Sequence, residues 1–199
     1  MPRRIVIIGA NAAGVDAAVA ARKTDRTAEI TLITKENKGA YSRCGIPYVL
    51  GGQIPSFDDL LVYPSSYYRM MKFDLRLETT ATNINTEAKT VEIQDKTGKK
   101  EVLNYDSLIL ATGAYPFVPP IKGKEKKGVS VVRTIEDGQK VDEALKTAKS
   151  AVVVGAGVIG LEVAAAFVER GVKTTVVEFL PYVLPVMLDK EMADVVQGM

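Results

Sequence analysis

The hydrophobic pattern of the chain repeats one arrangement twice. Residues 4–8 form a short apolar run rich in β-branched side chains, residues 12–23 are alanine-rich, and residues 30–34 form a second β-branched run. Short continuous apolar runs are typical of parallel strands buried on both faces, so this segment predicts a strand, a helix and a strand. The same order recurs in residues 151–154, 158–170 and 174–178. The sequence therefore predicts two βαβ units.

The segment between the two units has a different pattern. Residues 44–72 hold three prolines among apolar and aromatic residues, and we expect short helices there at 57–61 and 65–71. Residues 74–102 shift toward alternation of apolar and polar positions with a turn at 95–98, which predicts a small antiparallel β-meander. The remaining predicted elements are a buried strand at 107–111, a linker at 116–127 and a helix at 136–148.

These elements predict an α/β fold with two Rossmann-like nucleotide-binding domains, the first carrying the meander. The predicted domains are residues 1–115 and 116–199. A complete doubly wound domain needs more strands than the second range holds. We therefore expect the second domain to be truncated, and the chain to be a fragment of a longer protein.

Composition narrows the class of protein. Of the 199 residues, 47% are hydrophobic and 25% are charged, as in a soluble packed domain. The net charge of +2 gives no sign of nucleic acid or an anionic membrane as partner, and no apolar run approaches the roughly 18 residues of a membrane span. A single cysteine fits a reducing cytoplasm. Because the chain has no histidine, proton transfer must use carboxylate, tyrosine, lysine, thiol or water, and no metal site is predicted.

The second unit carries a glycine-rich turn between its first strand and its helix. In such a turn the first glycine permits a tight bend, the second lets the backbone approach a pyrophosphate, and the third lets helix and strand pack closely. Glu178 follows Gly160 by 18 residues, where an acid can bind a ribose 2′-hydroxyl and would repel a 2′-phosphate. This predicts NADH rather than NADPH, although a purely structural turn is the alternative. The predicted contacts at this turn are Gly155, Gly157, Val158, Ile159 and Gly160.

The turn of the first unit, Gly9–Gly14, has Asn11 where the middle glycine is expected. Asparagine tolerates left-handed backbone better than most residues, so we expect the turn to survive this change. The acidic residue is also displaced, and Glu36 is the candidate for binding the ribose. Its alternative interpretation is a solvated turn residue.

Cys44 lies in the segment Ser42–Tyr48, directly after the second strand of the first unit. A lone cysteine is usually a small buried hydrophobe. Its position favours a redox role, because this loop should pass over the reactive ring of a bound cofactor. A helix starting here and the neighbouring Arg43 would both lower the pKa of the thiol, unless Arg43 is only a solvated surface charge.

Four motifs in this order resemble the pyridine nucleotide-disulfide oxidoreductases, and specifically the single-cysteine branch of coenzyme A-disulfide reductases, NADH oxidases and NADH peroxidases. The motifs lie at Gly9–Gly14, Ser42–Tyr48, Ala111–Gly113 and Gly155–Glu162. The resemblance implies hydride transfer from NADH to FAD, and then reduction of an oxidised Cys44. The substrate would be a small disulfide, such as coenzyme A disulfide or a polysulfide, or oxygen. It also places Glu162 near the nicotinamide, where a helix-surface acid is the alternative interpretation.

The resemblance further implies which residues contact FAD, and it implies a homodimer formed through a C-terminal domain beyond Met199. The implied FAD contacts are Gly9, Asn11, Ala12, Ala13, Gly14, Lys35, Glu36, Arg43, Ala81, Ala111, Thr112, Gly113 and Arg133.

Two departures from the branch keep other functions open. NADH peroxidases and many NADH oxidases carry histidine where Asn11 stands, so disulfide reduction is favoured over peroxide reduction. Residues 34–36 and 41–43 look more like ferredoxin and rubredoxin reductases, so an electron-transfer flavoprotein is the main alternative. An inactive nucleotide-binding fragment is the third possibility.

Overall fold

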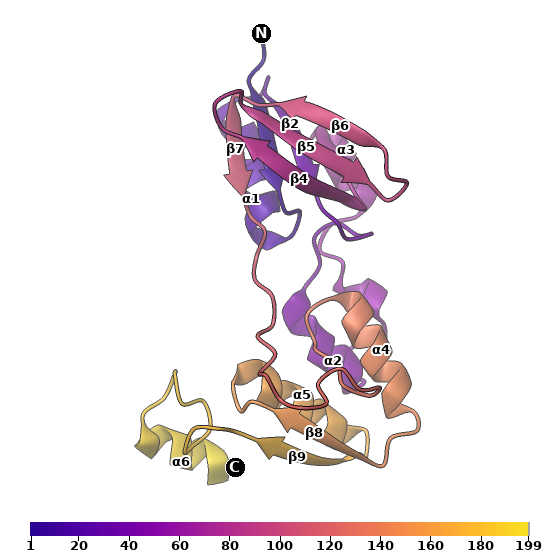
Figure 1. Ribbon diagram of the computed structural model, residues 1–199, viewed down its shortest axis with the longest axis vertical. Coiled ribbons are helices and arrows are strands. Elements are labelled where there is room, and N and C mark those ends of the chain that lie inside the picture. The colour runs from indigo at the N-terminus through magenta and orange to yellow at the C-terminus, as the bar shows by residue number, and fades with distance from the viewer. Residues whose placement is uncertain (199) are drawn as a thin grey trace. The chain divides into compact units, whose positions relative to one another are not determined.

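The computed structural model describes residues 1–198, which divide into two compact units. The first unit joins residues 1–41 to residues 61–114, and the second joins residues 42–60 to the chain from Tyr115 onward. Figure 1 traces the chain through both units. The division predicted at residues 115/116 remains a prediction.

A parallel sheet forms the centre of the first unit. Its strands, in spatial order, are β3 (Phe73–Arg76), β2 (Glu29–Ile33), β1 (Arg4–Ile8) and β7 (Ser107–Leu110). Ile8 pairs with Ile33 on one side and with Leu110 on the other, so these strands end together at one edge. That β3 belongs to this sheet is a correction, because residues 74–76 were predicted to open the meander. Phe73, at its start, is buried in the core formed by the helices and the sheet.

The sheet of the first unit is covered on both faces. One face carries α1 (Ala12–Thr24) and α3 (Ser65–Met70), and the other carries the antiparallel meander of β4 (Thr79–Asn85), β5 (Thr90–Asp95) and β6 (Lys100–Asn104). Successive side chains of β1 alternate between the faces. Ile7 packs with the helices, whereas Val6 packs with Val91 and Ile93 of the meander. This double burial explains why the strand is apolar from Ile5 to Ile8.

One arginine fastens the end of α1 to the sheet. The guanidinium of Arg22 donates to the carbonyls of Met71, Arg26, Ala28 and Lys72 at 2.7–3.0 Å. Arg26 and Ala28 belong to the loop that follows α1, whereas Met71 and Lys72 lie between α3 and β3. The planar fork of arginine thus joins the end of α1 to a segment about 50 residues further along the chain.

The second unit is built on two parallel strands, β8 (Ser150–Val154) and β9 (Lys173–Val177), paired residue by residue. Its helical segments are η1 (Arg43–Gly45), α2 (Ile46–Leu50), η2 (Phe57–Leu60), α4 (Ile135–Leu145), α5 (Val158–Glu169) and α6 (Lys190–Gly198). Within residues 1–198, no helix combines the length and apolar character needed to span a membrane.

The segment 42–60 is attached to α4 and α5. A Cβ atom added at Gly138 of α4 would lie 2.6 Å from the ring of Phe57 and 2.9 Å from Ile46, so these elements pack in direct contact. Arg170 donates to the carbonyl of Leu50 and to Asp142, both at 3.0 Å. Packing and hydrogen bonds together therefore fix the cysteine-bearing segment within the second unit.

Candidate active site

The first glycine turn is closed by two backbone contacts that exclude side chains. Gly9 has φ +113°, and a Cβ atom there would lie 2.0 Å from the carbonyl oxygen of Ala111. A Cβ atom at Gly14 would lie 1.8 Å from the carbonyl oxygen of Gly9. The first and last glycines are thus required by the packing of β1, α1 and the chain after β7.

Asn11 has a different role from the one expected of it. Its φ is −101°, so the backbone is extended and not left-handed. Its side-chain oxygen instead accepts a 2.8 Å hydrogen bond from the amide of Ala12, and Asn11 caps α1. Its side-chain amide nitrogen is buried and has no hydrogen-bond partner among the described residues. A buried donor without an acceptor, at the start of α1, suits a phosphate or another acceptor of a bound nucleotide.

Glu36 is held in place and is not a solvated turn residue. Its carbonyl accepts from the amide of Glu78 at 2.9 Å, and its amide donates to the hydroxyl of Thr34 at 3.3 Å. Its half-buried carboxylate accepts a 2.5 Å hydrogen bond from the hydroxyl of Tyr41. The neighbouring Lys35 is exposed.

The other residues predicted to contact FAD in the first unit lie after β7, in β4 and at the start of α1. Ala111 continues β7 beside the first turn, where its amide donates to the carbonyl of Ile8 at 2.8 Å. Thr112 and Gly113 follow it and are exposed. Ala81 lies in β4 of the meander, at the point where its pairing with β5 shifts register. Ala12 and Ala13 form the exposed first turn of α1.

The second glycine turn shares its strand contact and its last glycine with the first, but it differs at its first and middle positions. Gly155 has φ +104°, and a Cβ atom added there would meet no neighbouring segment of the described chain within 4 Å, unlike one at Gly9. The amide of Gly155 donates to the carbonyl of Val177 at 2.8 Å, as the amide of Gly9 donates to the carbonyl of Ile33. A Cβ atom at Gly160 would lie 2.0 Å from the carbonyl oxygen of Gly155. Gly157 differs, because no atom of residues 1–198 lies within 4 Å of a Cβ atom placed there. The backbone of Gly157 is therefore open to a ligand.

Three further predicted residues lie on α5. Val158 and Ile159 form its exposed first turn, directly after Gly157. Glu162 lies one turn further along and is half-buried. The amides of this first turn lack acceptors within the helix, so they can receive an anion.

Glu178 follows β9 and contacts the second turn directly. Its carboxylate accepts hydrogen bonds from the amides of Leu180 at 2.9 Å and Ala156 at 2.7 Å. These two donors lower the pKa of Glu178 below its ordinary value. The residue therefore remains ionised at neutral pH beside the glycine turn, where the sequence predicted an acceptor for a ribose.

Cys44 lies in η1, two residues before α2 begins, and it is an exposed free cysteine. Gly45 beside it is buried, and a Cβ atom there would lie 2.4 Å from Leu60. Arg43 donates a 2.8 Å hydrogen bond to the carbonyl of Arg133. Arg43 is therefore not merely a solvated charge, and Cys44 is not the buried hydrophobe of the alternative interpretation.

The structure groups the predicted residues by unit. Arg43, Cys44 and Arg133 lie in the second unit together with Gly155–Gly160, Glu162 and Glu178, whereas the other predicted FAD contacts lie in the first. Sequence reasoning missed two contacts. Tyr41, noted only as part of residues 41–43, binds Glu36, and the ring of Tyr115 lies 4.7 Å from the guanidinium of Arg133. No motif spacing predicts either contact.

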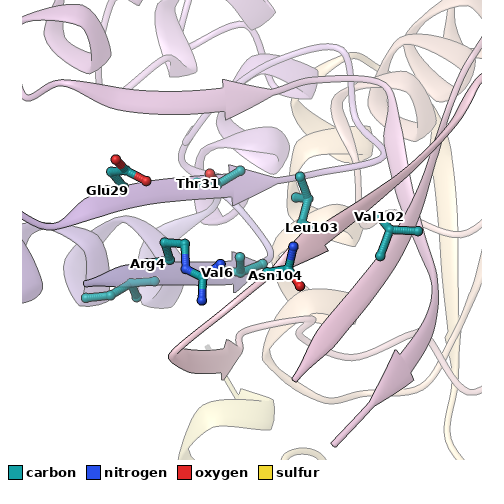
Figure 2. Close-up of a pocket in the computed structure, with 8 residues that line it drawn as sticks. Arg4, Val6, Glu29, Thr31, Val102, Leu103 and Asn104 are labelled. Atoms are coloured by element: carbon teal, nitrogen blue, oxygen red, sulfur yellow. The ribbon is translucent and has the colours of Figure 1, made fainter. Parts of the chain in front are cut away.

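A hollow of about 260 Å³ lies elsewhere in the first unit, between the sheet and the meander. Figure 2 shows Arg4 and Glu29, the first residues of β1 and β2, together with Leu103 and Asn104 of β6. This hollow is at the amino ends of the strands. The glycine turn and Glu36 follow their carboxyl ends, so the hollow is separate from the candidate nucleotide site.

The two turns fit nucleotide cofactors on three observations. The last glycine of each turn allows a close approach of helix and strand, Asn11 holds a buried amide group available to an acceptor, and Gly157 leaves its backbone uncovered. Comparison with known proteins agrees, because residues 3–199 match the family described as pyridine nucleotide-disulphide oxidoreductase. The chain belongs to this family. The predicted family is thereby confirmed.

Individual members of the family show how far the similarity extends. The chain is 46% identical over 197 residues to an NADH oxidase of Methanocaldococcus jannaschii, covering 98% of this chain and 44% of that protein. It is 36% identical over 174 residues to rhodocoxin reductase of Rhodococcus erythropolis, covering 87% of this chain and 40% of the reductase. A solved structure of an NAD-dependent persulfide reductase from A. fulgidus superposes with a TM-score of 0.93 at 39% identity, covering 98% of this chain and 37% of that one.

The chain therefore spans less than half of the length of these relatives. The predicted α/β fold with two Rossmann-like nucleotide-binding regions is confirmed by this structural similarity. FAD and NADH, the predicted cofactors, are those of the pyridine nucleotide-disulphide oxidoreductases. The roles assigned to single residues stay predictions.

Proposed function

We propose that this chain is the cofactor-binding part of an NADH-dependent flavoenzyme that reduces a small disulfide, a polysulfide or oxygen through Cys44. The observation that carries the proposal is the exposed thiol of Cys44 in a chain with two glycine turns, each followed by a helix. The match to a persulfide reductase supports sulfur as the acceptor.

Each turn has a distinct role in this proposal. The first turn, Asn11 and Glu36 hold FAD, with Lys35, Ala81 and the Ala111–Gly113 segment as further contacts. The second turn and Glu178 hold NADH, whose pyrophosphate rests on the open backbone of Gly157. The ionised Glu178 disfavours the 2′-phosphate of NADPH. Glu162 lies on α5, one turn past the proposed phosphate contact, toward the nicotinamide.

The chemistry on sulfur requires a thiolate that a substrate can reach. When bound, NADH and FAD supply an electron pair. The thiolate of Cys44 attacks one sulfur of the disulfide, forms a mixed disulfide and releases the other half as a thiolate. Two electrons and a proton then return Cys44 to the thiol state and release the second half. Arg43, the residue before this thiol, carries a positive charge and is held by its hydrogen bond to the carbonyl of Arg133.

Replacement of Cys44 by serine in the full-length protein tests this function. We expect coenzyme A disulfide-dependent NADH oxidation to fall by about 1000-fold or more, as is typical when a nucleophile is removed. The flavin content and the rate of flavin reduction by NADH should stay unchanged, which serves as the internal control. Undiminished turnover with disulfide would remove the thiol from the mechanism.

A second candidate is an electron-transfer flavoprotein that passes electrons to a small iron protein. The similarity to rhodocoxin reductase favours it, together with the Tyr41–Arg43 segment. Anaerobic titration with NADH separates the two candidates. A long-wavelength absorption band from contact between the thiolate and the flavin supports the role of Cys44, and its absence in an active reductase supports electron transfer to a protein.

We also infer that the whole enzyme is a cytoplasmic homodimer. The single cysteine supports a reducing compartment, and the resemblance supports a dimerisation domain beyond Met199. Sedimentation of the full-length protein tests the dimer.

A further inference from the structure

We propose that Tyr41 is a positioning residue for nucleotide binding in the first unit. Its hydroxyl holds the carboxylate of Glu36 ready for the adjacent hydroxyls of the adenosine ribose. This inference rests on the proposed function, in which the first turn binds FAD. It adds a residue that no spacing rule selects.

The location of Glu36 fits a contact with ribose. Glu36 follows β2, and the glycine turn follows β1, its neighbour in the sheet. The amide of Gly9 donates to the carbonyl of Ile33 at 2.8 Å, which joins the two strand ends directly. When a pyrophosphate lies on a glycine turn, the adenosine ribose extends toward the end of the neighbouring strand. Turn and carboxylate therefore lie on the same edge of one sheet.

The backbone of Glu36 is fixed on both sides. The amide of Thr34 donates to Arg76 at 2.9 Å, and the carbonyl of Thr34 accepts from Thr79 at 2.9 Å. The carbonyl of Glu36 accepts from Glu78, whose φ of +49° is uncommon for a non-glycine residue. The chain after β2 is thus bound to the turn between β3 and β4. The backbone on either side of Glu36 is thereby fixed relative to the sheet.

Tyr41 holds the side chain of Glu36, and Tyr41 is itself rigidly supported. Only 3% of Tyr41 is exposed, its backbone pairs with Leu61 in an isolated antiparallel bridge, and the adjacent Ala40 donates its amide to the buried hydroxyl of Tyr68 at 2.8 Å. From this support the hydroxyl of Tyr41 donates to Oε2 of Glu36 at 2.5 Å. The tyrosine ring cannot follow a moving carboxylate, so the carboxylate is held where the hydroxyl is.

The chemistry of the pair suits a diol. An ionised carboxylate offers about four lone-pair positions, and the hydroxyl of Tyr41 fills one of them. A carboxylate held in this way can also accept from ribose hydroxyls. A free glutamate side chain loses rotamer entropy when it binds, whereas a carboxylate that is already ordered loses much less. Tyr41 therefore raises the affinity for the nucleotide without needing to touch it.

The test measures FAD dissociation constants of the full-length apoprotein by quenching of flavin fluorescence. Tyr41→Phe keeps the buried ring and removes only the hydroxyl, and we expect the dissociation constant to rise by about 5- to 10-fold, because the carboxylate must then lose rotamer entropy when it binds. Tyr63→Phe removes a tyrosine hydroxyl from the same unit away from Glu36, and it should change the constant by less than about 2-fold. Glu36→Ala should weaken binding by itself.

The decisive measurement is the FAD affinity of the double variant that carries both Tyr41→Phe and Glu36→Ala. If Tyr41 acts through Glu36, Tyr41→Phe has no further effect on FAD affinity once Glu36 is alanine. Equal losses with and without Glu36 would show that Tyr41 supports only the fold, and no loss in either background would show that it does not position the carboxylate. Both results overturn the inference while wild-type FAD binding persists. Failure of the wild-type protein to bind FAD would instead overturn the proposed function and this inference with it.

Discussion

Replacing Gly157 or Gly160 by alanine separates a glycine needed for the ligand from a glycine needed for the fold. The two positions are in the same turn, and both changes add one methyl group. At Gly160 the new Cβ atom would lie 2.0 Å from the carbonyl oxygen of Gly155, closer than such atoms come in proteins. At Gly157 no described atom lies within 4 Å, and φ −78° with ψ 179° is accessible to alanine.

These contacts set the expected magnitudes. For Gly160→Ala, α5 must move by about 1 Å from the turn, and we expect a loss of unfolding free energy of about 3 kcal/mol or more. For Gly157→Ala, alanine is a poorer N-cap residue than glycine, but it also restricts the unfolded chain, so the net change stays within about 1 kcal/mol. Binding of NADH, in contrast, should be weakened strongly by Gly157→Ala. A methyl group at Gly157 keeps the pyrophosphate off the backbone, and losing one hydrogen bond to a charged group raises the dissociation constant by about 10- to 100-fold.

The assay is urea unfolding of both variants without cofactor, followed by NADH titration of the folded protein. Gly157→Ala should unfold like the wild-type protein and bind NADH poorly. The reasoning is refuted if Gly157→Ala binds NADH with wild-type affinity, because the open backbone would then not be the phosphate contact. Wild-type stability of Gly160→Ala would refute the steric argument for the fold.

Two further predictions concern the stability of the first unit. Arg22→Ala leaves four carbonyls without their donor, and we expect urea unfolding to show that the free energy of unfolding falls by about 2–4 kcal/mol. Arg22→Lys should restore little of this loss, because lysine lacks the planar fork. A loss below about 1 kcal/mol would contradict a stabilising role for these four hydrogen bonds. Hydrogen bonds from Arg4 lower the pKa of Asp106 from 3.8 to about 2, so the ionised carboxylate stabilises the fold above about pH 4, and this contribution is lost as the pH falls toward 2. Asp106→Asn should therefore lose less stability than the wild-type protein between pH 4 and pH 2, and identical acid profiles would count against the pair.

Local patterns were sufficient for much of the fold. The strand at residues 4–8 follows from its continuous apolar run, and the glycine positions of both turns follow from their spacing. The exposed Cys44 was found because it is the only thiol in the chain. The turn survives Asn11 as predicted, but the predicted reason, a left-handed backbone, is wrong. The backbone of Asn11 is extended, and its side chain caps α1.

The sequence by itself therefore determined the two βαβ units, the two glycine turns and the candidate thiol, because helix and strand periods, turn geometry and residue chemistry act over a few neighbouring positions. Only the tertiary structure decided that β3 joins the parallel sheet, that Arg43 binds the carbonyl of Arg133, and that Tyr41 holds Glu36. Strand pairing and side-chain contacts of this kind depend on which surfaces meet once the chain is packed. The identity of the neighbouring residues in the sequence does not encode that information.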